Sequence, residues 1–192
     1  MTRRGLILLM RRIVISAKMR RLRRLVLSLE SLRFKSLPIG SEDLGELCAV
    51  NMLMAHHAFT EHLTKPKDGF PVIDEVVIDG ADRDFRRGLE RGIIIGTETN
   101  ACRRLANLPG GDMTPSVLAN EARRVAAKLP IKVKIFGVPE MQKLKMGGVL
   151  GVGKGSAFPA KFIVMEYFGD KKGEAPVVLV GKGVTLDTGG TN

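Results

Sequence analysis

A strong break in the chain divides the sequence near its middle. Residues 107–112 read NLPGGD, which puts one proline, two adjacent glycines and two turn-forming polar residues side by side. Proline and glycine both end helices, and asparagine and aspartate favour turns. We therefore expect two separately folded parts with a boundary near this break.

The part before the break alternates helical and strand-like patterns. Residues 3–21 carry an apolar residue at every third or fourth position, which predicts an amphipathic helix. Ser41 precedes a second helical pattern and is its expected N-cap. The same reasoning predicts a strand, a helix, a strand and a helix at residues 25–29, 42–59, 72–78 and about 82–105.

The part after the break opens with a helix and is then dominated by strands. Thr114 followed by Pro115 is typical of an N-cap with proline at the first helical position, and this helix is expected to run to about Leu129. β-rich runs predict strands at residues 132–136, 161–168 and 176–180. Strands alternating with helices indicate an α/β fold with a largely parallel sheet in this half.

The positive charge lies almost entirely at the start of the chain. The formal net charge of the chain is +11. Residues 1–35 contain 11 Lys/Arg and one Glu, so this segment alone carries a net charge of +10. This basic helix has three interpretations: a mitochondrial presequence, a binding element for nucleic acid or anionic lipid, or an ordinary helix with a solvated basic face. We favour the ordinary helix, because a strand follows at once and the apolar face is wide.

The cysteines and the hydropathy pattern indicate an intracellular setting. Cys48 and Cys102 form no C-x-x-C pair and no dense pattern, as expected of a reduced, cytoplasmic protein. No stretch approaches the roughly 18 apolar residues that a membrane span needs, so we expect no membrane partner.

Two patterns that resemble ligand sites are better explained otherwise. His56, His57 and His62 are not spaced as i and i+4, the helical spacing of two-histidine zinc motifs, so we expect surface or interface histidines. Residues 148–154 fit most of a phosphate-loop pattern, but Gly155 stands where a hydroxyl must reach Mg²⁺, and a β-rich run follows in place of a helix. We therefore do not expect nucleotide binding.

The last segment carries the strongest chemical signal. Residues 177–180 read VVLV, a pattern typical of a buried strand, and residues 181–190 read GKGVTLDTGG. Lys182 and Asp187 thus lie among glycines just after an expected strand end, where α/β proteins bind ligands. A lysine ligates a metal only as the neutral amine, which requires a lowered pKa. A Lys–Asp surface pair is the alternative.

Three ordered motifs give the chain a family resemblance. Residues 180–190, VGKGVTLDTGG, resemble the metal-binding signature of leucyl (cytosol) aminopeptidases. Residues 107–109 and 114–115, NLP and TP, resemble the opening of that family's catalytic domain, and residues 147–156, GGVLGVGKGS, resemble its next glycine-rich segment. The resemblance is strong over residues 100–192 and weaker over residues 1–99.

The resemblance implies a fold, an activity and a metal site. It implies an α/β protein of two partial domains: an incomplete N-terminal domain with an interdomain helix in residues 1–99, and a truncated catalytic domain with a mixed, largely parallel sheet in residues 100–192. The family consists of two-metal peptidases, usually hexamers, that hydrolyse N-terminal residues from peptides with a pair of Mn or Zn ions. Residues at the positions of Lys182 and Asp187 are metal ligands there, the aspartate bridging both ions.

The departures from the family pattern limit what the chain itself is expected to do. The family's catalytic lysine and arginine, and its other metal carboxylates, are expected beyond Asn192, so no catalytic residue is expected within the chain. Lys154 stands where glutamine is usual, and Leu186 where phenylalanine is usual. One lysine and one carboxylate cannot hold two divalent ions, so we expect the 192-residue polypeptide to be inactive alone.

Two other functions stay open. One is a nucleic-acid-binding module that uses the basic N-terminal helix, with binding that weakens steeply with salt. The other is a non-catalytic assembly subunit that folds and oligomerises without activity.

Overall fold

The protein has two compact units. The computed structural model describes residues 1–170 and 173–186. The chain divides into Met1–Asn107 and Leu108–Asn192, so the division falls within the NLPGGD break. Each unit is described by itself below.

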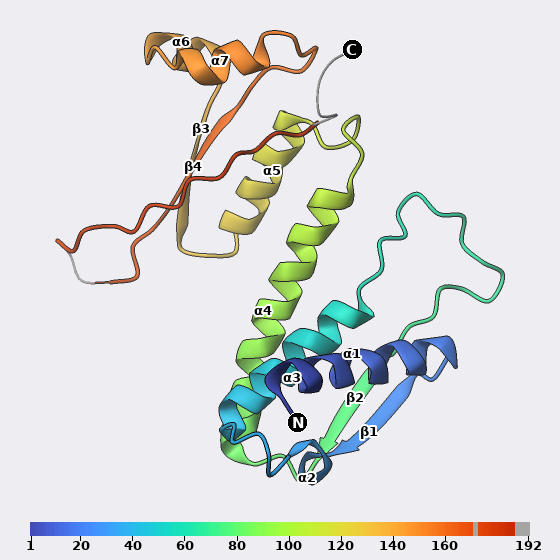
Figure 1. The fold of residues 1–192 in the computed structure, drawn as a ribbon. Coiled ribbons are helices and arrows are strands. Elements are labelled where there is room, and N and C mark those ends of the chain that lie inside the picture. The colour runs from blue at the N-terminus through green and yellow to red at the C-terminus, as the bar shows by residue number, and fades with distance from the viewer. Residues whose placement is uncertain (171–172, 187–192) are drawn as a thin grey trace. The chain divides into compact units, whose positions relative to one another are not determined.

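The first unit is built from four helices and a pair of parallel strands (Figure 1). Its elements are α1 (Arg3–Met19), β1 (Arg24–Ser28), α2 (Leu29–Leu32), α3 (Ser41–His56), β2 (Glu75–Asp79) and α4 (Arg83–Asn107). Strands β1 and β2 pair in parallel, from Arg24 opposite Glu75 to Ser28 opposite Asp79. The expected helices and strands of this half are confirmed, with shifts of a few residues at their ends.

One expected cap is wrong. Gly40 is the N-cap of α3, and Ser41 is already the first residue of the helix. The Ser41 hydroxyl instead donates a hydrogen bond to Asp82 Oδ2 at 2.7 Å, next to the Arg33–Asp82 ion pair. Because Asp82 lies just before α4, this polar cluster joins the starts of α3 and α4.

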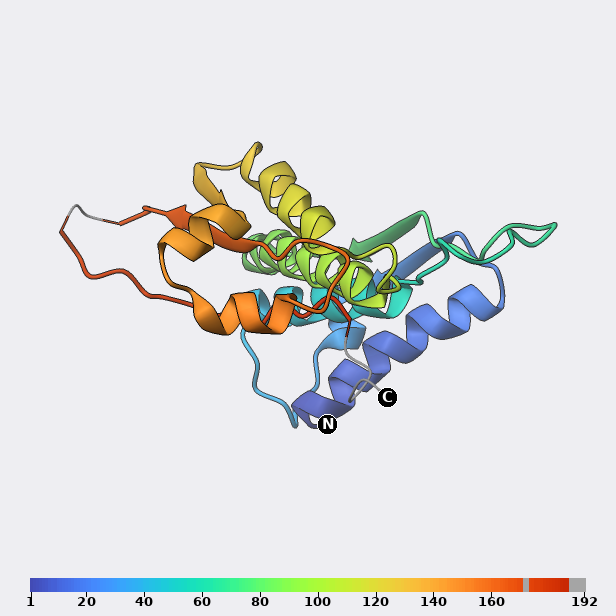
Figure 2. The same ribbon diagram turned by 90° about the horizontal axis from the view of Figure 1, so that it is seen from above.

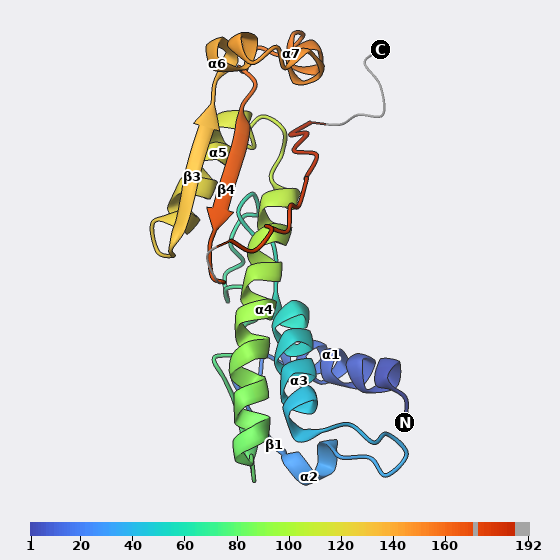
Figure 3. The ribbon, with the colours of Figure 1, turned by 90° about the vertical axis from the view of Figure 1, so that its left-hand side faces the viewer.

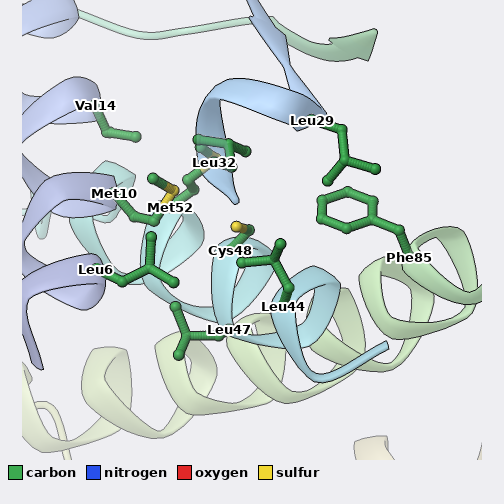
Figure 4. Packing of buried hydrophobic residues seen from close by; sticks show 10 residues of the cluster. All are labelled: Leu6, Met10, Val14, Leu29, Leu32, Leu44, Leu47, Cys48, Met52 and Phe85. Atoms are coloured by element: carbon green, nitrogen blue, oxygen red, sulfur yellow. The ribbon is translucent and has the colours of Figure 1, made fainter. Parts of the chain in front are cut away.

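The core of the first unit lies where α1, α2, α3 and α4 meet (Figure 4). Its fully or nearly buried side chains are Leu6, Met10, Val14, Leu29, Leu32, Leu44, Leu47, Cys48, Met52 and Phe85. Leu6, Met10 and Val14 occupy the apolar face of α1, with Ala17 buried below them. The interpretation of the N-terminal segment as a packed helix is therefore confirmed.

Helices α3 and α4 approach so closely that their backbones touch (Figure 3). Gly88, Gly92 and Gly96 recur every fourth residue along α4 and are all buried. A Cβ on Gly88 would collide with the carbonyl oxygen of Glu42, and one on Gly92 would lie 2.6 Å from that of Glu46. Only glycine leaves room for this contact.

The second unit contains three helices and one pair of strands in its described part (Figure 2). They are α5 (Pro115–Ala126), β3 (Ile131–Phe136), α6 (Val138–Lys143), α7 (Gly147–Gly153) and β4 (Phe162–Tyr167). The Thr114 side chain caps α5 by accepting a hydrogen bond from the Val117 N–H at 3.3 Å, as the Thr-Pro pattern predicts.

The sheet of the second unit differs from expectation in two ways. Strands β3 and β4 pair antiparallel, from Ile131 opposite Tyr167 to Phe136 opposite Phe162, although the sequence favoured parallel strands in this half. Residues 176–180 form no strand, and the expectation of one there is wrong. The run has strand-forming side chains, but a strand also needs a hydrogen-bonded neighbour. The overall class, mixed α/β, is confirmed.

Candidate metal centre

The NLPGGD break folds into a compact turn that leads into α5. The N–H groups of Asp112 and Met113 both donate to the Pro109 carbonyl, at 2.9 and 2.8 Å. Met113 and the capping Thr114 are buried, with 6% and 9% of their surface exposed. The turn and the first residues of α5 are therefore held by hydrogen bonds and by burial, and another segment can pack against them.

The glycine-rich motif at residues 147–156 is mostly helical. Residues Gly147–Gly153 form α7. Residues of this motif and of α6 line a cavity of about 410 Å³, with Lys154 and Ser156 at its wall. The glycines are therefore part of a helix, which the sequence pattern alone did not reveal.

Lys182 lies in an exposed stretch that packs against this turn and against α5. Residues 173–186 have no helix or strand, and Lys182 itself is exposed. Two contacts involve residues close to Lys182 in the sequence. A Cβ on Gly183 would lie 3.6 Å from Leu118 of α5, and one on Gly110 would lie 2.8 Å from Leu186 Cδ1. The NLPGGD break and the segment that carries Lys182, far apart in sequence, are therefore in contact.

The described residues do not fit a pair of metal ions. Asp187 lies outside the described residues, so its position relative to Lys182 is not part of the structure. Within residues 1–170 and 173–186 no three histidine, cysteine, aspartate or glutamate side chains gather as metal ligands. A lysine amine alone does not hold two divalent ions, since each needs several oxygen or nitrogen ligands.

His56, at the end of α3, has a structural role. His56 Nε2 accepts a hydrogen bond from the Ile73 N–H at 3.0 Å, and Lys18 Nζ donates to the His56 carbonyl at 2.7 Å. Burial, followed by the charge of Lys18, lowers the pKa of His56. His57 Nε2 is buried without a hydrogen-bond partner among the described residues, and burial also lowers its pKa. Neutral imidazoles suit both positions.

A larger cavity lies beside His56 in the first unit. Its volume is about 520 Å³, and its wall is mainly apolar, from β2, α3 and α4, with Met52, Val76 and Leu89 among its residues. Its polar groups have partners nearby: Asp74 pairs with Arg23, and Glu75 with Arg24. No sequence pattern indicated this cavity, because its lining comes from segments far apart along the chain.

Several basic residues near the N-terminus hold the first unit together. Arg11 donates to Asn51 Oδ1 at 3.0 Å, and Lys18 donates to the carbonyl of His56. Arg23, Arg24 and Arg33 form ion pairs with Asp74, Glu75 and Asp82. The side chains of Arg11, Lys18, Arg23 and Arg24 thus connect α1 and β1 to other segments of the unit, which favours the ordinary-helix interpretation over a nucleic-acid surface.

The cysteines are both free, and they differ in environment. Cys48 is fully buried in the core, and burial raises the pKa of its thiol to about 12. Cys102 on α4 is exposed. Among the described residues, no helix is long and apolar enough to span a membrane.

Comparison with known proteins identifies the second half most clearly. Residues 100–192 match the model of the catalytic domain of the cytosol aminopeptidase family. Probable cytosol aminopeptidases of Burkholderia mallei and Burkholderia pseudomallei are 39% identical over 157 residues, which are 80% of this chain and 31% of theirs. The chain thus spans about a third of the length of these curated relatives.

Solved structures share the fold. A mutant of tomato leucine aminopeptidase aligns with a TM-score of 0.83 at 22% identity, covering 96% of this chain and 37% of that one. The bottromycin maturation enzyme BotP in complex with Mn aligns with a TM-score of 0.69 at 21% identity, covering 83% of this chain and 33% of that one. The family model, the sequence relatives and the shared fold agree with the motifs in residues 107–190, and the chain belongs to the cytosol aminopeptidase family.

Proposed function

We propose that this chain is part of a two-metal aminopeptidase that removes N-terminal residues, leucine among them, from peptides. Lys182 and Asp187 would be its contribution to the metal centre. The observation that carries the proposal is the family match over residues 100–192, which contains the whole GKGVTLDTGG motif. The contact between Gly110 and Leu186 supports it, because it seats the residue next to Asp187 on the turn before α5.

The bound ions would supply Lewis acidity and an activated water. The Lys182 amine would serve as a neutral ligand, which requires burial or nearby cations to lower its pKa. In the structure Lys182 is exposed. This supports our view that the site is completed by ligands from other parts of the protein, and that this chain alone is inactive.

Further properties follow from the family. We propose that residues 1–99 are part of an N-terminal α/β domain and that residues 100–192 are part of the catalytic domain. We also propose a hexamer acting in the cytoplasm, with Mn or Zn as its metals. The Mn-bound BotP structure supports a manganese enzyme.

The inactivity of the chain alone is directly measurable. The purified 192-residue chain is assayed with a leucine chromogenic substrate in the presence of Mn²⁺ or Zn²⁺. We expect a rate no higher than that of buffer with the same metal. Turnover that persists through purification and disappears with a chelator would contradict this expectation.

The role of Lys182 is tested in a chimera. Residues 100–192 replace the matching stretch of the Burkholderia pseudomallei relative, which is 39% identical to this chain. We expect metal-dependent aminopeptidase activity from the chimera. We expect Lys182→Ala to reduce it by at least about 100-fold, since loss of groups that merely support a ligand already costs 10- to 100-fold.

Lys154→Ala is the matched control, since Lys154 is also an exposed lysine in a glycine-rich motif of the same unit. We expect it to retain activity. A chimera that folds and assembles but stays inactive, or one that survives Lys182→Ala, would overturn the proposed function.

A further inference from the structure

The long connection between α3 and β2, residues 57–74, contains no helix or strand. Residues 61–68 in its middle are all exposed. Backbone hydrogen bonds close two short turns in it, at residues 60–63 and 66–69. A connection of this kind has few internal contacts, so its position depends on the points where it is attached to the rest of the unit.

Ile73 is the apolar anchor of this connection. Among residues 57–74, all of which the structure describes, it is the one side chain that packs against the core cluster of the first unit. Its neighbours Val72 and Asp74 are exposed. The backbone N–H of Ile73 donates a hydrogen bond to His56 Nε2 at 3.0 Å. The anchor is therefore held by its side chain and by its backbone.

Two other attachments of the connection do not change in mild acid. Arg21 donates a hydrogen bond to the carbonyl of Asp68 at 3.0 Å, and arginine stays protonated at all relevant pH values. Arg23 pairs with Asp74, and its hydrogen bond lowers the pKa of the Asp74 carboxyl, so this pair also stays charged. The attachment through the imidazole of His56 differs from both, because a histidine titrates near pH 6.5.

The groups closest to His56 favour its neutral form. Lys18 of α1 donates to the His56 carbonyl at 2.7 Å. Burial acts most strongly on the ring, and together with the charge of Lys18 it lowers the pKa of His56 below its ordinary value of 6.5. The neighbouring His57 acts in the same direction. Asp74 acts in the opposite direction, but its carboxylate is already paired with Arg23.

The charged groups of β2 and α4 in this region have partners of their own. Glu75 of β2 pairs with Arg24, and Arg86 of α4 donates to a backbone carbonyl. Arg103 of α4 disfavours protonation of His57, next to the ring of His56 along the chain. The two carboxylates that line the larger cavity together with His56 are those of residues 74 and 75, and both already have an arginine partner.

Protonation of His56 removes the acceptor that holds Ile73. A neutral imidazole that accepts at Nε2 carries its hydrogen on Nδ1. The added proton binds to Nε2, and both ring nitrogens are then donors. The N–H of Ile73 would face another donor at a half-buried position, where an unsatisfied amide is costly. The new positive charge would also lie close to that of Lys18.

We propose that His56 is an acid-sensitive switch that attaches residues 57–74 to the first unit when neutral and releases them when protonated, while the helices stay folded. The proton comes from solvent, and the hydrogen bond between Ile73 and His56 is the bond that breaks. The released state binds the proton more readily, so the attached state prevails at neutral pH and loses stability as the pH falls below 6.5. The inference does not depend on the proposed aminopeptidase activity.

Hydrogen exchange of the Ile73 amide in the full chain measures this release. The exchange rate is followed by NMR at pH 7.5 and 5.5, and division by the intrinsic rate at each pH gives the opening constant. We expect this constant to increase by up to about 10-fold at the lower pH. That factor is the limit for one proton bound by a group whose pKa in the released state is 6.5.

Two sets of amides show whether the release is local. Those of Leu47 and Cys48 in α3 should exchange more slowly than that of Ile73 at both pH values, because they open only with the core. Those of β3 and β4 lie in the other unit and should keep the same opening constant at both pH values. An Ile73 amide that is as protected as α3, or whose opening constant does not change with pH, contradicts the proposal.

Two variants of His56 assign the effect to its imidazole. His56→Gln keeps an oxygen acceptor that does not titrate, so the opening constant at Ile73 should be the same at both pH values. His56→Leu has no acceptor, so the constant should already be raised by roughly 2- to 10-fold at pH 7.5, through the loss of one hydrogen bond, and should not rise further in acid. A His56→Gln chain that keeps the pH dependence of the parent overturns the proposal, because another group would then release the connection.

Arg21→Ala is the matched control, because it removes another attachment of the same connection without removing a histidine. It should raise the exchange of the Gly69 amide equally at both pH values and leave the pH dependence at Ile73 unchanged. Loss of that pH dependence in Arg21→Ala contradicts the proposal, since the switch would then not be His56. All variants are first compared with the parent chain by circular dichroism to confirm that the helices are folded.

Discussion

At the scale of single residues, the imidazole of His56 holds the long connection between α3 and β2. Its Nε2 accepts the N–H of Ile73, and Lys18 binds the carbonyl of the same residue. Three charged or titratable groups act on the ring besides burial: Lys18 and His57 disfavour its protonation, and Asp74 favours it. Burial and Lys18 outweigh Asp74, so the pKa of His56 is lowered in the folded protein.

This lowered pKa predicts an acid-sensitive first unit. The unfolded chain takes up a proton at His56 as the pH falls through 6.5, whereas the folded chain resists it. Stability therefore decreases as the pH falls below about 6.5, because the unfolded state binds more protons. His57 acts in the same direction. The free energy of unfolding, measured with urea at pH 7.5 and 5.5, should drop between the two values.

The His56→Gln variant should show a smaller drop, since its amide oxygen can accept the Ile73 N–H at both pH values. An unchanged pH dependence in His56→Gln would show that other groups cause the acid sensitivity.

At the scale of elements, the α3–α4 pair is the tightest contact in the first unit. Gly45 on α3 faces the backbone of Phe85, and Gly88, Gly92 and Gly96 on α4 face the backbone or side chains of α3. Two ion pairs, Arg87 with Glu42 and Arg91 with Glu46, border the same contact. Hydrogen bonding to Arg87 lowers the pKa of Glu42.

Adding one methyl group to this contact should separate the helices. Gly88→Ala would place a Cβ against the carbonyl of Glu42, where only backbone is available to move. We expect a loss of about 3 kcal/mol or more in the free energy of unfolding, at or above the upper range for overpacking. Urea unfolding followed by circular dichroism measures it.

Gly151→Ala is the matched control for this change. Gly151 is also helical, in α7, but nothing lies within 4 Å of an added Cβ. Replacing a helical glycine by alanine in open space should be neutral or stabilise by about 0.5–1 kcal/mol. A Gly88→Ala variant as stable as the parent would mean that the helices are not in backbone contact in solution.

Elements with long periodic patterns could be predicted from the sequence, and short ones could not. The apolar spacing of Leu6, Met10 and Ala17 gave α1, and Thr114-Pro115 gave the start of α5. Helices α2, α6 and α7 were missed, because four to seven residues show no clear period. The strand expected at residues 176–180 was wrong because pairing, which no local pattern encodes, decides whether a run becomes a strand.

At the scale of the whole molecule, the buried core is concentrated in the first unit. Buried residues are numerous in α1–α4. In the second unit the buried hydrophobic side chains among the described residues are Met113, Ala119 and Met141. Burial of apolar surface is the main favourable term in folding.

The second unit should therefore open more readily than the first. Native-state hydrogen exchange followed by mass spectrometry should find slow exchange in α3 and α4, and much faster exchange in α5, β3 and β4. A unit with fewer buried side chains should have a lower free energy of opening. Protection of β3 and β4 equal to that of α4 would contradict this expectation.

The candidate site was predictable as a motif but not as a geometry. The residues at 180–190 identified the family and gave Lys182 and Asp187 as ligands by resemblance. No sequence pattern indicated that the Leu186 side chain packs against Gly110, because that contact joins segments far apart in sequence.

The glycine contact between α3 and α4 also has a consequence in genetic terms. One base change turns a glycine codon into an alanine codon, the smallest substitution that glycine can undergo. At Gly45, Gly88 and Gly92 the added methyl group meets fixed backbone. At core positions filled by flexible side chains, such as Met10 or Met52, neighbouring atoms can adjust. Selection should therefore act most severely on the codons that specify no side chain at all.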